Sequence, residues 1–295
     1  MRVPSSAYYV MKITKTKIVA AIGTLIWLAT LAFASIYDLD ISIKIANKSS
    51  LFGRVLEVAG EPPAILFTSF NFALMAAYFG KCDKRRVRGV PLAVLTVIGC
   101  VGTCVFTTVK IVKYLAEYKA TEPSALTTLY AVCAGFIIAF VFIMLALFMN
   151  EETLQKYFRV AWRCALAAIL TFLIIWEFKL VWGRVRPRQL ELGGGYFAYT
   201  PWYLPQGFTG YFSFPSGHTA NATVILSSLY YLRFLPQKFK WLKPICIALL
   251  AVWIVLVAFS RVVVGAHFLS DVLFGMAITL CIVYFCKPKE KQICI

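Results

Sequence analysis

Long apolar runs, separated by short polar stretches, recur from one end of the chain to the other. Each run approaches the roughly 20 residues that a helix needs to cross the hydrocarbon core of a bilayer. The eight runs lie at residues 17–37, 62–80, 89–112, 127–149, 158–182, 216–234, 242–260 and 265–286. The pattern therefore predicts an all-α, polytopic transmembrane helical bundle of about eight spans.

Composition supports a membrane protein over a soluble one. Hydrophobic residues make up 61% of the 295 positions, which is more than one soluble core of this length can bury. Repeats and low-complexity linkers are not evident, so we expect residues 1–295 to form a single integral membrane domain. Residues 41–60 alternate apolar and basic side chains and are predicted to form an interfacial helix.

The net charge of +17 follows the predicted topology. Basic clusters fall at both termini and in the second, fourth and sixth connections, whereas the first and third connections mix both signs. This distribution is typical of the positive-inside rule and places both termini in the cytoplasm of a multi-pass protein of the plasma or inner membrane. Since topology and anionic lipids account for the charge, we expect membrane lipids as partners, no nucleic acid and no obligate protein partner.

Nine cysteines are spread through the chain without paired spacing in an exterior loop. Most fall within or near predicted spans, where cysteine acts as a small apolar residue. Neither a disulfide framework nor a zinc site is indicated, and we expect no metal and no cofactor.

A first polar cluster, residues 179–187, ends the fifth span. Lys179 and Arg186 are seven positions apart, which on one helix is two turns, and Pro187 is expected to end that helix. Two cations at a helix end can clamp an oxyanion. The alternative is a lysine that extends to the interface beside a helix stop. Arg184 and Arg188 nearby are expected to be solvated flanking charges, the alternative being contact with a second phosphate or a headgroup.

A second cluster, residues 215–218, opens the sixth span. Ser216 can cap the helix, Gly217 lets the backbone approach an anion, and His218 follows directly. Because a helix N-terminus favours anions, this tetrapeptide predicts a phosphate contact. An ordinary cap with an interfacial histidine is the alternative.

A third cluster, residues 260–271, joins the seventh and eighth spans. It contains Arg261, His267 and Asp271, and the last two are four positions apart, so they are predicted to share a helix face. A carboxylate on one ring nitrogen leaves the other nitrogen free as a nucleophile. A structural ion pair is the alternative, but an aspartate in an apolar span is costly and favours a function.

The topology places all three clusters at the outer membrane face, because odd-numbered spans run outward. The two histidines are the only ones in the sequence. Phosphoryl transfer needs one group to attack phosphorus and one to protonate the leaving oxygen, and imidazole can do both near neutral pH. A phosphate-handling site is therefore the leading hypothesis.

The motifs Lys-x6-Arg-Pro, Pro-Ser-Gly-His and Ser-Arg-x5-His-x3-Asp, in this order, resemble the three signatures of the type 2 phosphatidic acid phosphatase superfamily, which includes glucose-6-phosphatase and the vanadium haloperoxidases. The resemblance covers about residues 179–271. It implies a six-span phosphatase core, here residues 89–286, with residues 1–88 as additional N-terminal spans. It also implies metal-independent hydrolysis of phosphate esters or diphosphates through a phosphohistidine.

The same resemblance implies roles for individual residues. His267 would be the nucleophile, Asp271 its orienting partner and His218 the general acid. The implied phosphate-binding residues are Lys179, Arg186, Ser216, Gly217 and Arg261.

We therefore expect a membrane phosphatase for a lipid phosphate or lipid diphosphate at the extracytoplasmic face. The sequence leaves open a lipid phosphotransferase, a hydrolase of soluble phosphates, and a transporter or channel that uses Lys110, Glu177 and Asp271. It does not choose among phosphatidate, phosphatidylglycerol phosphate, undecaprenyl diphosphate and lipid A phosphates.

Overall fold

A computed structural model describes residues 6–83, 86–192 and 198–289, and every regular element within these ranges is a helix. Basic residues of the predicted cytoplasmic clusters at 1–5, 84–85 and 290–295 lie outside the described residues. The α-helices are α1 (Ser6–Ile45), α2 (Leu51–Ala59), α3 (Pro62–Lys81), α4 (Arg86–Tyr118), α5 (Ala125–Leu147), α6 (Glu151–Trp182), α7 (Pro187–Leu192), α8 (Gly217–Val224), α9 (Leu242–Val263) and α10 (Leu269–Cys286). Two 3-10 helices, η2 (Ile225–Phe234) and η3 (Gln237–Phe239), lie between α8 and α9.

Seven helical stretches of the described chain are long and apolar enough to cross a membrane, as expected for a multi-pass membrane protein. They correspond to seven of the eight predicted spans, with α2 and α3 counted as one stretch. The remaining predicted span, the sixth at residues 216–234, corresponds to α8 followed directly by η2. The chain is helical there too, but it changes from α to the tighter 3-10 winding partway along.

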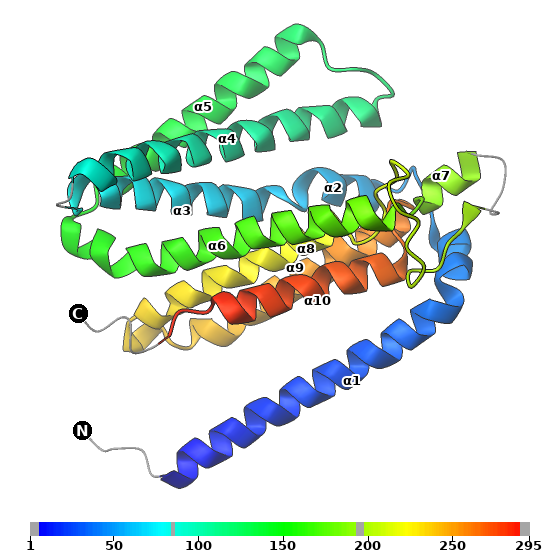
Figure 1. Cartoon of the computed structure of the whole chain (residues 1–295), viewed down its shortest axis with the longest axis horizontal. Coiled ribbons are helices and arrows are strands. Elements are labelled where there is room, and N and C mark those ends of the chain that lie inside the picture. Colours follow the sequence, from blue (N-terminus) through cyan, green and yellow to red (C-terminus); the bar gives the residue numbers. More distant parts are fainter. Residues whose placement is uncertain (1–5, 84–85, 193–197, 290–295) are drawn as a thin grey trace.

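The helices run up and down in one bundle (Figure 1). The start of α1 and the end of α10 lie at the same end of this bundle, and α7 lies at the opposite end. The end of α6 and the starts of α8 and α10 also lie at that opposite end, so all three sequence motifs meet there. The predicted interfacial helix within 41–60 is instead the last turns of α1, a turn and the short helix α2.

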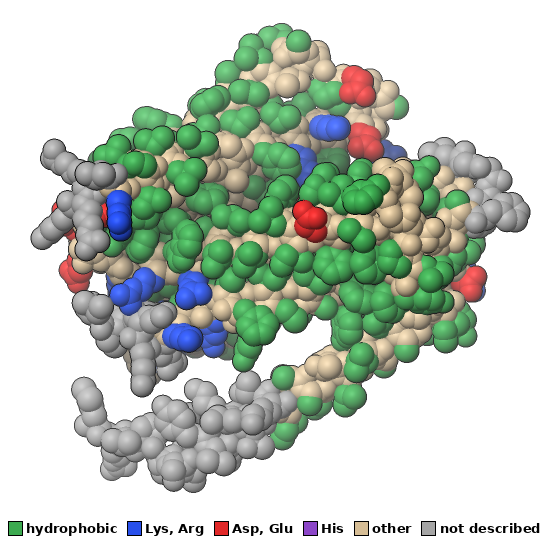
Figure 2. Space-filling model, viewed as in Figure 1, with side chains coloured by type: hydrophobic (Ala, Val, Ile, Leu, Met, Phe, Trp, Pro, Cys, Tyr) green, Lys and Arg blue, Asp and Glu red, His purple; other side chains and the backbone are tan. Residues whose placement is uncertain are grey.

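Small side chains hold the centre of the bundle together. Helix α3 packs against α4, α5 and α6 through a buried cluster that includes Ala73, Cys100, Ala139 and Ala161. Residues of this size let helix backbones approach closely, which is the main source of packing energy between helices in lipid. Large apolar side chains cover much of the outer surface in turn (Figure 2). Much of the outer surface of the bundle is thus apolar, as expected for helices that face lipid.

Candidate active site

A cavity of about 880 Å³ opens at the motif end of the bundle. Six of the eight predicted site residues line it, namely Lys179, Arg186, Gly217, His218, Arg261 and His267. The other two, Ser216 and Asp271, are fully buried. Three motifs that are distant in sequence therefore contribute to one site, with both histidines at the same cavity.

Helix α6 ends one turn beyond Lys179, at Gly183. Gly183 has a left-handed φ of 52°, and a Cβ at this position would lie 2.1 Å from the Gly207 carbonyl oxygen. The prediction that Lys179 and Arg186 share a helix face is therefore wrong, because Gly183 ends the helix between them. The backbone turns instead, and the two cations reach the cavity from a helix and from the segment that follows it. Lys179 Nζ donates to the Phe212 carbonyl oxygen at 2.6 Å.

The second motif begins α8 as expected. Ser216 is the N-cap residue, and its hydroxyl accepts from the Thr219 amide at 3.4 Å. The Ser216 amide donates to the carbonyl oxygen of Asp271 at 2.9 Å, which joins the second motif to the third. Gly275, one turn along α10, makes this approach possible because a Cβ there would lie 2.5 Å from the Ser216 carbonyl oxygen. Gly217 faces the cavity, where a Cβ would meet only the Lys179 side chain, at 3.6 Å.

His267 and Asp271 lie side by side. The prediction that they share a helix face is wrong, because His267 lies before the helix. Helix α10 begins at Leu269, and Asp271 caps it by accepting from the Phe268 amide at 2.9 Å. His267 therefore lies in the loop before the helix, with its Nδ1 3.6 Å from Asp271 Oδ2. This distance is longer than an ordinary hydrogen bond, and Nδ1 has no hydrogen-bond partner among the described residues. Burial lowers the pKa of His267 to about 3 against the opposing effect of Asp271, so the ring is neutral near pH 7.

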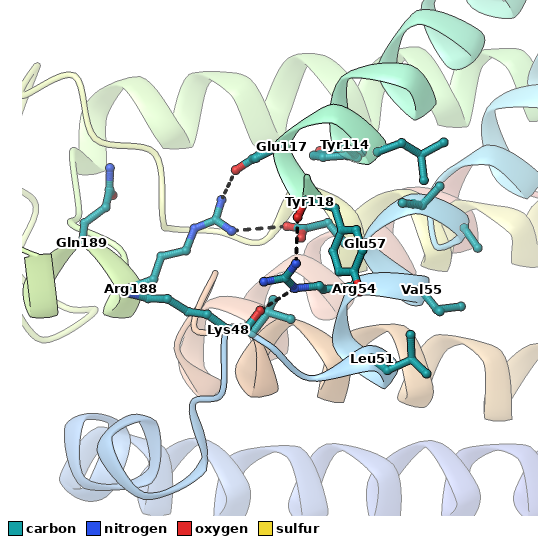
Figure 3. A pocket seen from close by; sticks show the side chains of 14 residues that line it. Lys48, Leu51, Arg54, Val55, Glu57, Tyr114, Glu117, Tyr118, Arg188 and Gln189 are labelled. Atoms are coloured by element: carbon teal, nitrogen blue, oxygen red, sulfur yellow. Dashed lines mark hydrogen bonds and ion pairs between the residues drawn. The ribbon is translucent and has the colours of Figure 1, made fainter. Parts of the chain in front are cut away.

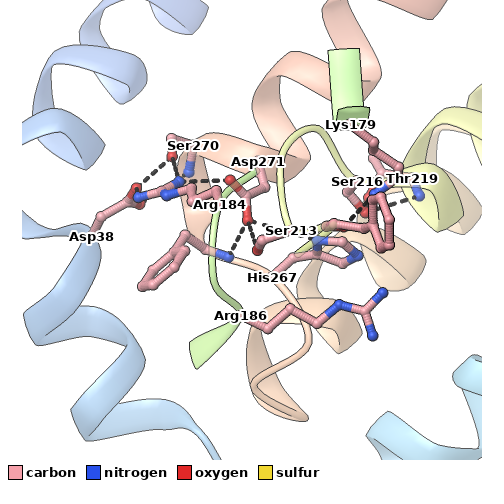
Figure 4. A network of polar contacts seen from close by, with 12 residues as sticks. Asp38, Lys179, Arg184, Arg186, Ser213, Ser216, Thr219, His267, Ser270 and Asp271 are labelled. Atoms are coloured by element: carbon pink, nitrogen blue, oxygen red, sulfur yellow. Dashed lines mark hydrogen bonds and ion pairs between the residues drawn. The ribbon is translucent and has the colours of Figure 1, made fainter. Parts of the chain in front are cut away.

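Arg184 is the centre of a buried network behind His267 (Figure 4). Its guanidinium lies 2.6 Å from Asp271 Oδ1 and 2.8 Å from Ser270 Oγ, and it stacks 4.0 Å above the Phe268 ring. Ser213 Oγ donates to the other Asp271 oxygen at 2.5 Å. The expectation that Arg184 is a solvated flanking charge is wrong: it is 1% exposed because two carboxylates and a serine compensate its charge.

The second carboxylate of this network is Asp38, from the first helix. Asp38 accepts from Arg184 at 3.1 Å and from the Ser270 amide at 3.0 Å, and the Ser270 hydroxyl also donates to it. Asp38 directly follows the predicted first span, 17–37, and so was expected in an exterior connection, but α1 continues past it and its side chain is fully buried. A carboxylate at the end of an apolar run was the signal available for this contact.

Arg261 is fully buried and is compensated by helix α2. Its guanidinium lies 3.2 Å from Glu57 Oε1 and donates to the Gly53 carbonyl oxygen at 2.8 Å. Glu57 also lies 3.4 Å from Arg188, which reaches Glu117 at 3.7 Å (Figure 3). Arg188 is therefore half-buried and paired, which corrects the expectation of a solvated charge. A second cavity of about 620 Å³, with several apolar residues in its lining, lies beside these ion pairs.

His218 has an acceptor next to each ring nitrogen. Nε2 lies 3.2 Å from the main-chain carbonyl oxygen of Glu57, and Nδ1 lies 3.5 Å from Glu61 Oε1. Sequence reasoning missed Glu57 and Glu61 as members of the site because it treated them as charges in an exterior connection. Only the fold brings α2 and the start of α3 against the motif that carries His218.

Comparison with known proteins gives a family match and a curated relative. Residues 156–292 match the family model described as PAP2 superfamily. A stretch of 95 residues is 36% identical to phosphatidylglycerophosphatase B of Bacillus subtilis (strain 168); it covers 32% of this chain and 46% of that protein, about half its length. No solved structure matches the chain significantly. The resemblance drawn from the three motifs is thus confirmed at the level of the family model, since residues 156–292, which match the PAP2 superfamily, contain all three motifs.

Proposed function

We propose that this protein is an integral membrane phosphatase that hydrolyses a lipid phosphate monoester or a lipid diphosphate through a phosphohistidine. One observation carries the proposal: both histidines line a single cavity together with three cationic side chains, Lys179, Arg186 and Arg261. The family match covers all five of these residues. Helix α2, which contributes the partners of Arg261, lies outside it. The name of the Bacillus relative supports a phosphorylated glycerolipid as substrate.

His267 is the nucleophile in this proposal. Asp271 lies on the Nδ1 side of the ring, so Nε2 is the nitrogen left to attack phosphorus. Burial keeps the ring neutral, and a neutral ring has the lone pair that attack requires. Once phosphorus is bound the ring becomes cationic, and the Asp271 carboxylate then offsets that charge.

The cations bind the phosphoryl oxygens. Lys179, Arg186 and Arg261 supply positive charge around one cavity, and Ser216 and Gly217 begin a helix whose free amides favour an anion. In transfer the negative charge is shared among the equatorial oxygens of phosphorus. Fixed cations around these oxygens stabilise that arrangement more than they stabilise the bound ester.

The reaction needs two histidines and one water molecule, and both histidines return to their starting protonation states. His267 Nε2 forms a bond to phosphorus while the bond from phosphorus to the lipid oxygen breaks, and His218 gives its proton to that oxygen. The lipid alcohol leaves. His218, now neutral, takes a proton from water as the water oxygen attacks phosphorus, the P–N bond breaks, and inorganic phosphate is released with His267 neutral again.

In this proposal the site lies at the extracytoplasmic face. The basic clusters of the sequence favour a cytoplasmic location for the bundle end at which α1 starts and α10 ends, and the cavity is at the other end. The apolar tail of the substrate stays in the bilayer while its headgroup reaches the cavity. The neighbouring apolar cavity beside α2 offers room for the part of the lipid next to the phosphate.

Phosphate release by the purified protein in detergent tests the proposal, with a chelator present and a panel of lipid phosphates and soluble sugar phosphates. We expect release from lipid phosphates only, unaffected by chelator, and at least a thousand-fold loss in His267→Ala. Rapid quench with substrate labelled in the phosphate should trap an acid-labile label on the protein. Phosphate found on an acceptor lipid instead of free phosphate would indicate a phosphotransferase. Substantial turnover by His267→Ala would reject the assigned nucleophile.

A further inference from the structure

Glu61 is a buried carboxylate at the cavity that the proposed mechanism does not use. It precedes the first turn of α3, is 3% exposed, and lies outside the segment that matches the family. Burying a carboxylate costs several kcal/mol unless it is paired. Its partners therefore indicate why it is there.

Helix capping does not explain this side chain. Glu61 occupies the N-cap position of α3, but within the described residues its carboxylate makes no capping hydrogen bond. It points instead toward α8 and α4. Asn221 Nδ2 donates to Glu61 Oε1 at 2.9 Å, Lys110 Nζ forms an ion pair with Oε2, and His218 Nδ1 lies 3.5 Å from Oε1.

The groups around His218 come from four helices and from the loop before α10. Glu61 from α3 is the carboxylate at ion-pair distance from the ring among the described residues, and the Glu57 carbonyl of α2 lies at the other nitrogen. The Tyr114 ring of α4 packs 5.5 Å from the imidazole. The remaining charged or titratable groups that face the ring are Lys110 of α4, Arg261 of α9 and His267.

An imidazole with an acceptor at each nitrogen can satisfy both only when it carries two protons, because the neutral ring has one N–H. The negative charge of Glu61 favours that doubly protonated ring relative to the same site without it. The Glu57 carbonyl at Nε2 belongs to the main chain and can be replaced as acceptor by the oxygen of a leaving group. The surroundings of His218 are thus those of a proton donor with Nε2 as the donating atom.

We propose that Glu61 is a positioning residue for proton donation: through Nδ1 it orients His218 and favours the protonated form of the ring, while Lys110 and Asn221 fix the Glu61 carboxylate. The inference rests on the proposed phosphatase function. It gives each histidine its own carboxylate, Asp271 for the nucleophile and Glu61 for the acid, and it places the second one in the N-terminal part of the chain.

The test uses the dependence on the leaving group. Dodecyl phosphate needs a proton on its departing alkoxide, whereas a dodecyl-substituted nitrophenyl phosphate keeps the tail and releases a phenolate that leaves without one. In Glu61→Gln we expect kcat/KM, which reports the steps up to departure of the leaving group, to fall about 100-fold for dodecyl phosphate, as for loss of a general acid, and less than about five-fold for the aryl phosphate. The alkaline limb of kcat/KM for dodecyl phosphate should also move to lower pH.

Three variants complete the design. His218→Gln should show the same selective loss, Asp38→Asn should affect both substrates equally because it acts on the side of the nucleophile, and Glu152→Gln, an exposed glutamate in the first turn of α6, should match the wild type. The ratio of the two rates is taken on one preparation, so a smaller folded fraction in Glu61→Gln cancels.

Equal losses on both substrates, or no loss on either, would overturn the role of Glu61 while leaving the phosphatase standing. A wild-type protein that releases phosphate from neither substrate would instead overturn the proposed function, and this inference with it.

Discussion

Ser216 and Asp271, which belong to different motifs, are joined through their main chains by a hydrogen bond of 2.9 Å from the Ser216 amide to the Asp271 carbonyl oxygen. This bond fixes the start of α8 against the first turn of α10. It therefore sets the distance between the segment that carries His218 and the segment that carries His267. The contact depends on Gly275, whose missing side chain leaves room for the Ser216 carbonyl.

We expect Gly275→Ala to separate the two motifs. Its Cβ would lie 2.5 Å from a backbone oxygen that cannot rotate away, so the helices must shift, at a cost of about 1–3 kcal/mol. Thermal melting in detergent should show the destabilisation, and phosphate release should fall with it. Gly102→Ala is the matched control, since no atom lies within 4 Å of that Cβ, and it should stay within about 0.5 kcal/mol of the wild type. Equal behaviour of both variants would contradict the packing argument.

The pairing of Arg184 with Asp38 and Asp271 predicts strong coupling between substitutions. Arg184→Gln leaves two buried carboxylates without a cation and should destabilise the fold by about 3–5 kcal/mol. Asp38→Asn removes one of those carboxylates, so the double variant should be less damaged than the sum of the two single variants by about 1–3 kcal/mol. Unfolding measured for the four members of this cycle gives the coupling directly. Strict additivity would mean that the two side chains act independently.

Glu57 lies 3.2 Å from Arg261 at the cavity that we propose binds phosphate, so we expect it to compete for that cation with an incoming anion. Glu57→Gln removes the competing charge, and we expect inorganic phosphate and vanadate to bind about five-fold tighter, which corresponds to about 1 kcal/mol of electrostatic energy. Inhibition constants measured at fixed pH and salt give this number. Weaker binding would show that Glu57 serves chiefly to hold Arg261 in place.

His267 predicts how stability depends on pH. Its pKa is near 6.5 in an unfolded chain and is lowered to about 3 in the folded protein by burial. Between these values the unfolded state binds the proton and the folded state does not, so this residue's contribution is full above pH 6.5 and is lost as the pH falls, by up to about 1.4 kcal/mol per pH unit. Melting temperatures measured from pH 7 to pH 4 should fall less steeply in His267→Gln than in the wild type. Parallel curves would contradict the lowered pKa.

Much of the fold follows from the length of apolar runs. Lipid admits helices of a given length and little else, so seven of the spans and the shared end of the three motifs could be read from residue order. Local geometry was harder to predict. Lys179 and Arg186 were placed on one helix because spacing alone does not show that Gly183 meets the Gly207 carbonyl and ends the helix.

The residues that the motifs name were found because each motif combines several residue types at fixed spacing. The acidic partners of these residues, Asp38, Glu57 and Glu61, were not predicted. Each is a single acid outside any motif, and its role depends on which helix lies opposite it in the fold. The burial of Arg184 was missed for the same reason, since its neutralising groups come from α1 and α10. Pairing between distant helices is a property of the assembled bundle.

The bonds from Asp38 to Arg184 and Ser270 also constrain how the protein is made. Translation makes α1 before the segment that carries Arg184 and before α10, so Asp38 has neither partner when α1 enters the membrane. The set of bonds that joins Asp38 to Arg184 and Ser270 can be complete only once α10 is in place. A chain that stops before α10 therefore lacks the bond from the Ser270 amide to the buried Asp38 carboxylate.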